Sequence, residues 1–242
     1  MAKSMYSVPV SEVFGEDEAL ATTLAFGDII NVRSGFKGLQ FYCASAFEFL
    51  TTPRIGKVIL YDASTATYYD QTTAAIDNDA DTEVNLGTMT TTDILYVGAV
   101  DVFLGLSIDV GTVNANTVTT LTVEYWDGGA WVDFSGEDDG TDAANTLAQD
   151  GLYTWTLPTN WHTTSVNGSV PLYYMRFYPA GTLTAGTSFD RLITINKGTD
   201  YAYFAAAMVH DFNFDEDVVG GLQFLSKSGT PTLFVNHIKY KG

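Results

Sequence analysis

Alternating apolar and polar positions between residues 121 and 135 predict a β-hairpin. The stretch has the sequence LTVEYWDGGAWVDFS, in which every second residue from Leu121 to Tyr125 is apolar. Side chains of a strand point alternately to its two faces, so this pattern predicts one buried face and one face toward solvent. Asp127, Gly128 and Gly129 can supply the positive φ angles of a tight turn, and a return strand is expected from residue 130 to 135.

Strand-like patterns also occur through most of the remaining chain. Runs rich in Val, Ile, Thr, Tyr and Phe are IINVRS from residue 29, GLQFYCASAFEFLTT from 38, GKVILYDASTATYYD from 56 and ILYVGAVDVFLGLSIDVG from 94. Such residues fit a pleated, half-buried surface. The continuously apolar run Val58–Tyr61 suggests a strand that is buried on both faces. The sequence therefore predicts an all-β protein with a β-sandwich or jelly-roll-like central unit.

The spacing of turn signals predicts three regions. Residues 1–27 are expected to form an N-terminal arm, which contains a short helix from Ser11 to Leu20 or is instead flexible or bound to a partner. Residues 93–198 are expected to form the central β-sandwich. Residues 28–92 and 199–242 are expected to form a flanking β region, in which the two ends of the chain build a second small sheet. The tetrapeptide GLQF occurs at residue 38 and again at residue 221, either by chance or at two equivalent edges of one sheet.

Composition supports a packed domain and makes some partners improbable. The chain has 242 residues, of which 46% are hydrophobic and 17% are charged, which is enough apolar material for one large or two small cores. The formal net charge of −18 disfavours nucleic acid and anionic membranes as partners. The same charge is compatible with three roles, namely solubility, calcium binding or docking onto a basic surface. The N-terminal residues lack the apolar core of a signal peptide, which predicts folding in a cytosol-like compartment.

No familiar catalytic motif is present in the sequence. The single cysteine, Cys43, lies between aromatic residues and is expected to be a small buried hydrophobe. His162, His210 and His237 are far apart and form no zinc-binding pair. The sequence also lacks a nucleophile elbow, a phosphate-binding loop and a dinucleotide fingerprint. We therefore expect a protein that is not an enzyme and has no cofactor.

Acidic clusters are the best candidates for a metal site. Weak calcium binding is considered for the alternating carboxylates of Asp77, Asp79, Asp81 and Glu83. The EF-hand pattern fails there, because Thr82 occupies the position of its glycine and Thr88 that of its last glutamate. Two further clusters lie at residues 137–142 and 215–217. A solvated acidic loop is the simpler interpretation of each cluster.

The four tryptophans are concentrated in one part of the chain, between residues 126 and 161. Trp126, Trp131 and Trp161 are candidates for an interaction surface. Trp126 is predicted to lie on the hairpin face opposite Leu121, where it could stack on a sugar ring as in carbohydrate-binding sandwiches. Alternatively, Trp126 and Trp131 pair across the hairpin and cover a core edge, and this second interpretation is favoured.

The block from Asp93 to Ile195 resembles a β-sandwich unit that recurs in structural proteins of tailed bacteriophages. The matching elements are the hairpin with Tyr125-Trp126, the run from Gly151 to Trp161 with its G-x-x-x-W-x-x-P-x-x-W spacing, and the strand from Tyr173 to Arg176. The resemblance covers less than half of the chain. It is specific for virion architecture but not for one role within the virion.

The resemblance implies a virion component without catalysis that is made in the host cytoplasm. A capsid-surface cement or decoration protein is the first expectation. Such a protein binds across neighbouring capsid subunits, often as a trimer, with the major capsid protein or other virion proteins as partners. The N-terminal arm would then reach a neighbouring subunit. The alternatives are a tail, baseplate or fibre accessory protein and a carbohydrate-binding module.

Overall fold

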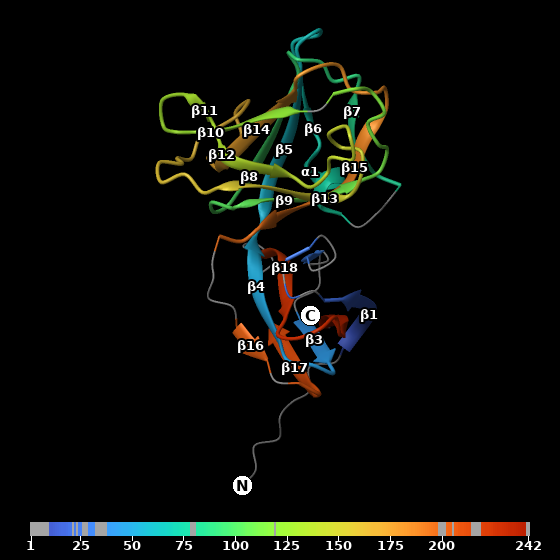
Figure 1. Ribbon diagram of the computed structural model, residues 1–242. Coiled ribbons are helices and arrows are strands. Elements are labelled where there is room, and N and C mark those ends of the chain that lie inside the picture. Colours follow the sequence, from blue (N-terminus) through green and yellow to red (C-terminus); the bar gives the residue numbers. More distant parts are fainter. Residues whose placement is uncertain are drawn as a thin grey trace.

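The computed structural model describes residues 10–20, 22, 24–25, 29–31, 38–77, 81–118, 120–197, 202–204, 206–213 and 219–240. The described chain is almost entirely β-structure, which confirms the predicted all-β class. It forms two stacked domains, the larger of which is at the top of Figure 1. No helix within these ranges is long and apolar enough to cross a membrane.

The larger domain is a sandwich of two antiparallel sheets. One sheet has the strand order β11-β10-β14-β8-β5-β6 and the other has the order β12-β13-β9-β15-β7. The elements of this domain are β5 (Ile55–Asp62), β6 (Thr67–Asp70), α1 (Thr72–Ile76), β7 (Val84–Gly87), β8 (Ile94–Ala99), β9 (Gly105–Val110), β10 (Leu121–Trp126), β11 (Trp131–Asp133), β12 (Ser135–Asp139), β13 (Gly151–Thr156), β14 (Tyr173–Pro179) and β15 (Thr187–Ile195). Inward-facing residues of both sheets, such as Leu95, Phe177, Leu106 and Phe189, share one core.

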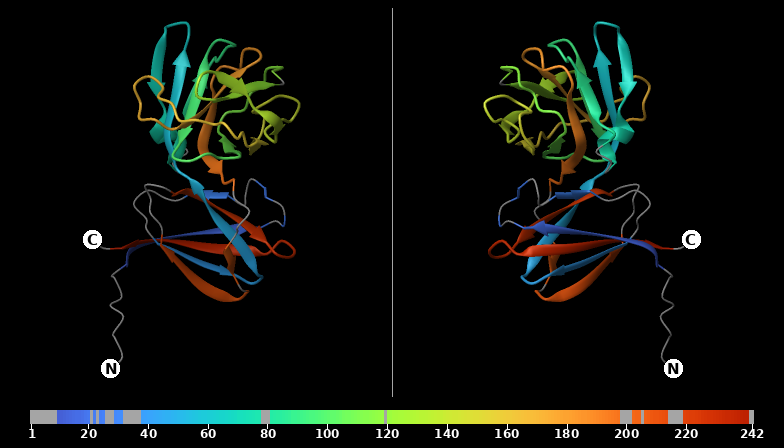
Figure 2. Two further views of the ribbon diagram at one scale, coloured as in Figure 1. Left: turned by 90° about the vertical axis from the view of Figure 1, so that its left-hand side faces the viewer. Right: turned by 90° about the vertical axis from the view of Figure 1, so that its right-hand side faces the viewer.

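The smaller domain consists of two four-stranded sheets, with the orders β1-β19-β3-β17 and β16-β4-β18-β2. Figure 2 shows that they are made by the first and last parts of the chain. The strands are β1 (Val10–Ala19), β2 (Ile29–Asn31), β3 (Gly38–Cys43), β4 (Phe47–Pro53), β16 (Ala202–Phe204), β17 (Met208–Asn213), β18 (Val219–Ser226) and β19 (Thr232–Tyr240). The core between the sheets is rich in phenylalanine and contains Cys43, which is buried as expected.

The predicted hairpin is present in the larger domain. Strand β10 pairs with β11 so that Trp126 lies opposite Trp131. Leu121, Val123 and Tyr125 are buried in the core, as their alternation predicts. Gly128 has a φ of +100°. The Asp127 carboxylate accepts hydrogen bonds from the backbone N–H groups of Gly129 and Ala130. Glycine is required in this turn because other side chains rarely adopt such a conformation.

The domain boundary expected at residue 93 lies near Arg54 instead. Strands β5, β6 and β7 belong to the sheets of the larger domain, so residues 55–92 are not part of the flanking region. The reason is that β5 pairs with β8, which places the apolar run Val58–Tyr61 inside the six-stranded sheet of the larger domain. The flanking region also forms two sheets, where one small sheet was expected.

The short helix expected from Ser11 to Leu20 is wrong, because Val10–Ala19 forms strand β1. It pairs with β19 from Val10 opposite Tyr240 to Ala19 opposite Thr232. Pairing with a neighbouring strand satisfies the backbone N–H and C=O groups along this segment, and it outweighs the weak local capping signal. Residues 1–9, 21, 23 and 26–27 of the expected arm lie outside the described residues.

The two GLQF tetrapeptides lie in facing sheets rather than at edges of one sheet. The first begins β3 and the second lies in β18, and both strands are interior to their sheets. Phe41 and Phe224, the last residues of the two tetrapeptides, meet edge-to-face with ring centroids 5.4 Å apart. The repeated pattern therefore places one phenylalanine from each sheet at the centre of the same core.

The two domains are joined tightly where β15 meets β4 and β18. The Thr194 hydroxyl donates a hydrogen bond to the Pro53 carbonyl, and the Asn196 N–H donates to the Gln223 side chain at 2.9 Å. Ile29 of the smaller domain packs with Ile193 and Ile195 of the larger one. This junction combines apolar packing with hydrogen bonds, so the domains are expected to be held in a fixed relation.

Gly221→Ala tests the close approach of the strands at this junction. A Cβ atom on Gly221 would lie 2.6 Å from Ile193 Cγ2 and 2.9 Å from the Ile30 carbonyl oxygen. We expect this overpacking to lower the free energy of unfolding by about 1–3 kcal/mol in urea titrations. Gly129→Ala is the matched control, because only one atom, at 3.7 Å, comes within 4 Å of its Cβ. Equal stability of the two variants would contradict the packing described for the junction.

Candidate functional site

Trp155 and Trp161, the second half of the tryptophan-rich segment, lie in the core of the larger domain. The indole N–H of Trp155 donates to the Phe103 carbonyl and that of Trp161 donates to the Tyr174 carbonyl, each at 3.1 Å. Trp161 is only 6% exposed and contacts the rings of Phe103 and Phe134. The structure therefore places this interaction candidate inside the fold, where its apolar ring is buried and its polar N–H is satisfied.

Trp126 and Trp131 pair on the outer face of the six-stranded sheet, which agrees with the favoured interpretation. Their rings meet edge-to-face with centroids 5.6 Å apart. The Arg176 guanidinium lies 4.6 Å from the centre of the Trp131 ring and also forms an ion pair with Glu124. The hairpin and the Tyr173–Arg176 strand thus contact each other across β10 and β14.

The acidic candidates for calcium are only partly described. Asp79 lies outside the described residues, as do Asp215, Glu216 and Asp217. Asp77 accepts a hydrogen bond from Thr82, and Asp81 and Glu83 are exposed. In the part of the chain that the structure describes, no group of three His, Cys, Asp or Glu side chains could hold a metal ion. Calcium binding by this loop therefore stays a prediction.

In the second acidic cluster, at residues 137–142, one carboxylate serves the fold. Asp139 accepts hydrogen bonds from the hydroxyls of Thr141 and Thr146, which are both buried. Burial raises the pKa of Glu137, although a hydrogen bond from the Tyr153 hydroxyl at 2.8 Å opposes this effect. These contacts tie β12 both to the loop that follows it and to strand β13.

The histidines are placed apart by the fold. His162 follows Trp161 in a loop, where its backbone N–H donates to the Trp126 carbonyl at 2.9 Å. His237 is buried in β19 of the smaller domain. His210 lies in β17, and its side chain is outside the described part of the structure. The fold thus brings His162 and His237 to different domains.

A pocket of about 790 Å³ opens beside strand β6 in the larger domain. Its floor is apolar and consists of Leu60, Leu86 and Met89, of which Leu86 and Met89 are at most 2% exposed. Tyr69, which lies opposite Leu60 in the β5–β6 register, lines the pocket and is 43% exposed. Sequence analysis did not identify this site, because the short segment TYYD has no clear alternation. Two adjacent tyrosines next to a buried strand were the available signal.

A single buried carboxylate connects the two sides of this pocket. Asp93 accepts hydrogen bonds from the Ala63 N–H at 2.8 Å, on the β5–β6 side, and from the Thr90 N–H and hydroxyl at 2.7 and 2.8 Å, on the β7–β8 side. Asp62 holds the β5–β6 turn through bonds from Ser64 and Thr65. The pocket walls are therefore held in place by hydrogen bonds.

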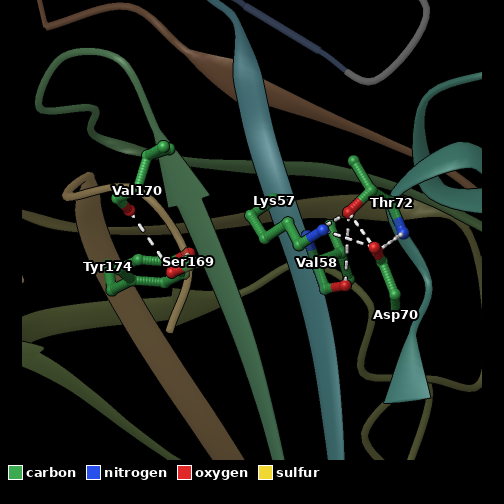
Figure 3. Close-up of polar contacts among 7 residues, drawn as sticks. All are labelled: Lys57, Val58, Asp70, Thr72, Ser169, Val170 and Tyr174. Carbon is green, nitrogen blue, oxygen red and sulfur yellow. Dashed lines mark hydrogen bonds and ion pairs between the residues drawn. The ribbon is translucent and has the colours of Figure 1, made fainter. Parts of the chain in front are cut away.

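The opposite face of β6 carries an ion pair, as Figure 3 shows. The Lys57 ammonium group of β5 pairs with the Asp70 carboxylate, and Thr72 donates its N–H to the same carboxylate at 3.0 Å. Beside them the Ser169 hydroxyl bonds to the Tyr174 hydroxyl at 2.7 Å. A smaller pocket of about 210 Å³ lies between these groups. Of its lining residues, Lys57 and Asp70 are paired with each other and Ser169 bonds to Tyr174, so these contacts hold the hairpin and the 167–169 turn.

An apolar row crosses the outer face of one sheet in the smaller domain. Val209 of β17 lies opposite Tyr42 of β3, and Tyr42 lies opposite Phe234 of β19. The three side chains are 57%, 38% and 43% exposed, respectively. The Tyr42 and Phe234 rings are 6.1 Å apart. We refer to Val209, Tyr42 and Phe234 as the apolar row.

Comparisons with known proteins add little to this description. No protein-family model matches the chain, and no curated protein matches it. Among solved structures, the mavirus penton protein is similar at 8% sequence identity, with 92% of this chain and 99% of that chain covered and a TM-score of 0.11. A TM-score this low carries no argument about fold or function.

Trp161→Ala tests the assignment of this residue to the core. Removing a large buried ring is expected to lower the free energy of unfolding by about 3–5 kcal/mol in urea titrations. Trp126→Ala serves as the control, because Trp126 is half-buried on the sheet surface and should cost clearly less. If Trp161→Ala leaves stability unchanged, the side chain is not part of the core.

Asp70→Asn tests the ion pair beside β6. Burial raises the pKa of Asp70, but hydrogen bonds from Lys57 and Thr72 outweigh that effect and lower the pKa from 3.8 to about 2. A carboxyl group with a lowered pKa stabilises the fold above pH 3.8, and this contribution is lost as the pH falls toward 2.

The variant should therefore be less stable than the unmodified protein at pH 7, by at most about 1 kcal/mol because the pair is largely exposed. The difference should shrink when unfolding is measured at increasingly acidic pH. Lys57→Gln, used as the second arm of a double-mutant cycle, should reduce the cost of Asp70→Asn. A difference that does not depend on pH would contradict the assigned interaction.

Proposed function

We propose that this protein is a non-catalytic structural component of a tailed-bacteriophage virion. Its role would be that of a capsid-surface cement or decoration protein, which binds across neighbouring capsid subunits and assembles as a trimer. It would be made in the host cytoplasm and end up on the particle. The observation that carries this proposal is the apolar row on the smaller domain, taken together with the phage-like pattern of residues 93–195.

The phage-like pattern supports a scaffold role because its residues build the fold. Trp155 and Trp161 fill the core of the larger domain, and Arg176 joins β14 to β10 through Glu124. These side chains are used for packing within the chain rather than for contact with a substrate. A rigid sandwich of this kind is suited to a protein that acts through its shape.

The apolar row supports a docking role. Large contiguous apolar patches on a protein surface often mark interaction sites, and aromatic residues are enriched at the centres of interfaces. Tyr42 and Phe234 lie side by side on neighbouring strands, where a partner could cover both rings at once. Covering them would bury apolar surface without changing the fold of the sheet.

The charge of the chain favours a partner that is less acidic than the chain itself. With a formal net charge of −18, two copies repel each other unless their contact surfaces are locally neutral. A basic or neutral capsid surface would be approached faster, and the apolar row would then supply the short-range contact. A tail, baseplate or fibre accessory protein is the alternative position, and imaging of the assembled particle distinguishes it from the capsid.

A double substitution, Tyr42→Ser with Phe234→Ser, tests the docking face. Each substitution replaces a partly exposed aromatic ring with a small polar side chain outside the core, so the fold should persist and binding to particles should fall by about tenfold or more. Binding is measured by co-sedimentation with capsids that lack the protein, and folding by circular dichroism. The control is Val170→Ser, since Val170 is 66% exposed in the larger domain.

Unchanged particle binding by the folded double variant would overturn the docking face, and so would an equal loss in the control. Deletion of residues 1–27 is a poorer test, because it removes strand β1 and the buried Leu20. The proposed trimer is checked separately by light scattering of the purified protein.

A further inference from the structure

The pocket beside β6 has the composition of a site for a small ring-shaped ligand. It combines the apolar floor of Leu60, Leu86 and Met89 with an aromatic wall, Tyr69, that remains accessible to solvent. Concave sites with an apolar surface and a few convergent polar groups are the usual form of ligand pockets. The volume of about 790 Å³ is within the range of such pockets.

The position of Tyr69 explains why its ring is accessible. Strand β6 is the edge strand of its sheet, and Tyr69 lies opposite Leu60, whose side chain faces the core. An edge position leaves the ring without a neighbouring strand on one side. Tyr69 thus extends the core face of the sheet into the open pocket, where one face of a ring can stack on it.

The rim of the pocket offers neutral hydrogen-bonding groups. Asn85 and Thr88 are exposed, and Gln71 lies at the end of β6. The Asn85 side-chain oxygen accepts the Gly87 N–H at 2.7 Å, which directs the amide of Asn85 and leaves its NH2 group as a donor. Because Asp93 holds both walls together, these groups are positioned before a ligand arrives.

The negative charge of the pocket lining restricts the class of ligand that can bind. Asp62 and Asp93 both line the pocket, and none of the other described residues around it is basic. A phosphate, sulfate or carboxylate would therefore be repelled. A neutral ligand that has an apolar face and several hydroxyl groups matches the aromatic wall and the amide and hydroxyl rim.

We propose that the pocket between the β5–β6 hairpin and the β7–β8 loop binds a neutral saccharide unit. One face of the sugar ring stacks on Tyr69, and its hydroxyl groups bond to Asn85, Gln71 and Thr88. The site differs from the Trp126 position considered from the sequence, because Trp126 is engaged with Trp131. The proposal is independent of the virion role, since the apolar row lies on the other domain.

The test measures binding of neutral sugars to the full chain by nuclear magnetic resonance. The probes are glucose, galactose, mannose and N-acetylglucosamine with their short oligomers, and glucuronic and sialic acids serve as anionic controls. We expect at least one neutral sugar to shift the resonances of Tyr69, Asn85 and Thr88. The anionic sugars should produce no such shifts.

Substitutions assign this binding to the pocket. Tyr69→Ala should weaken it by about tenfold or more, while Tyr69→Phe, which keeps the ring, should retain it. Tyr68→Ala is a closely matched control, because Tyr68 is the adjacent residue of β6, is 39% exposed and lines the smaller pocket on the opposite face. It should bind sugar as the unmodified protein does.

Three results would overturn the proposal. The first is that no neutral sugar of the panel binds at millimolar concentration. The second is that binding persists in Tyr69→Ala or is lost equally in Tyr68→Ala. The third is that benzyl alcohol, an apolar probe, shifts these resonances while sugars do not, which would make the pocket a site for apolar groups. None of these results bears on particle binding, so failure here is distinguishable from failure of the virion role.

Discussion

The whole arrangement depends on antiparallel pairing between strands from the two ends of the chain. In the smaller domain β3 lies between β19 and β17, and β18 lies between β4 and β2. Neither sheet can form from one end of the sequence alone. The larger domain is therefore inserted between β4 and β16. Its first strand, β5, and its last strand, β15, connect to the smaller domain at the same junction. Such long-range pairing requires closure of a large loop, which is expected to make assembly of the smaller domain slow.

The same pairing determines what each surface can do. Alternation along β3 and β19 sends Phe41 and Val235 into the core and leaves Tyr42 and Phe234 outside. The apolar row is thus a consequence of register, because a shift by one residue would exchange the two sets. In the larger domain, alternation along β6 places Tyr68 and Tyr69 on opposite faces of the strand, next to two different pockets. The edge position of β6 leaves both rings partly exposed.

Sequence patterns were sufficient for the elements whose signals are local. The β10–β11 hairpin follows from alternation and turn residues, and the all-β class follows from the strand-like runs. The burial of Val58–Leu60 follows from the continuously apolar run Val58–Tyr61, whose last residue is only partly buried. The segment from Val10 to Ala19 was misassigned because its strand state depends on β19, more than 200 residues away. The domain boundary expected at residue 93 is wrong for a similar reason, since the partner of β5 is β8 and the segment between them contains β6, α1 and β7 of the same domain.

The candidate sites were harder to anticipate than the fold. Tryptophans concentrated in one segment suggest an interaction surface, but large aromatic residues are most often used for packing, as Trp155 and Trp161 are. The pocket beside β6 is formed by residues from the β5–β6 turn, the β7–β8 loop and Thr182, which have no common motif. The hydrogen bonds of Asp93 connect two of these segments, the β5–β6 turn and the β7–β8 loop.

The two proposed surfaces are compatible because they lie at different ends of the molecule. Strand β5 begins beside the domain junction at Ile55 and ends at Asp62, which lines the pocket. Eight residues of strand span about 26 Å, so the pocket opening lies well away from the smaller domain. In Figure 1 the β5–β6 turn is accordingly at the end opposite β3 and β17. A protein attached through the apolar row would hold its larger domain outward, with the pocket beside Tyr69 accessible to solvent.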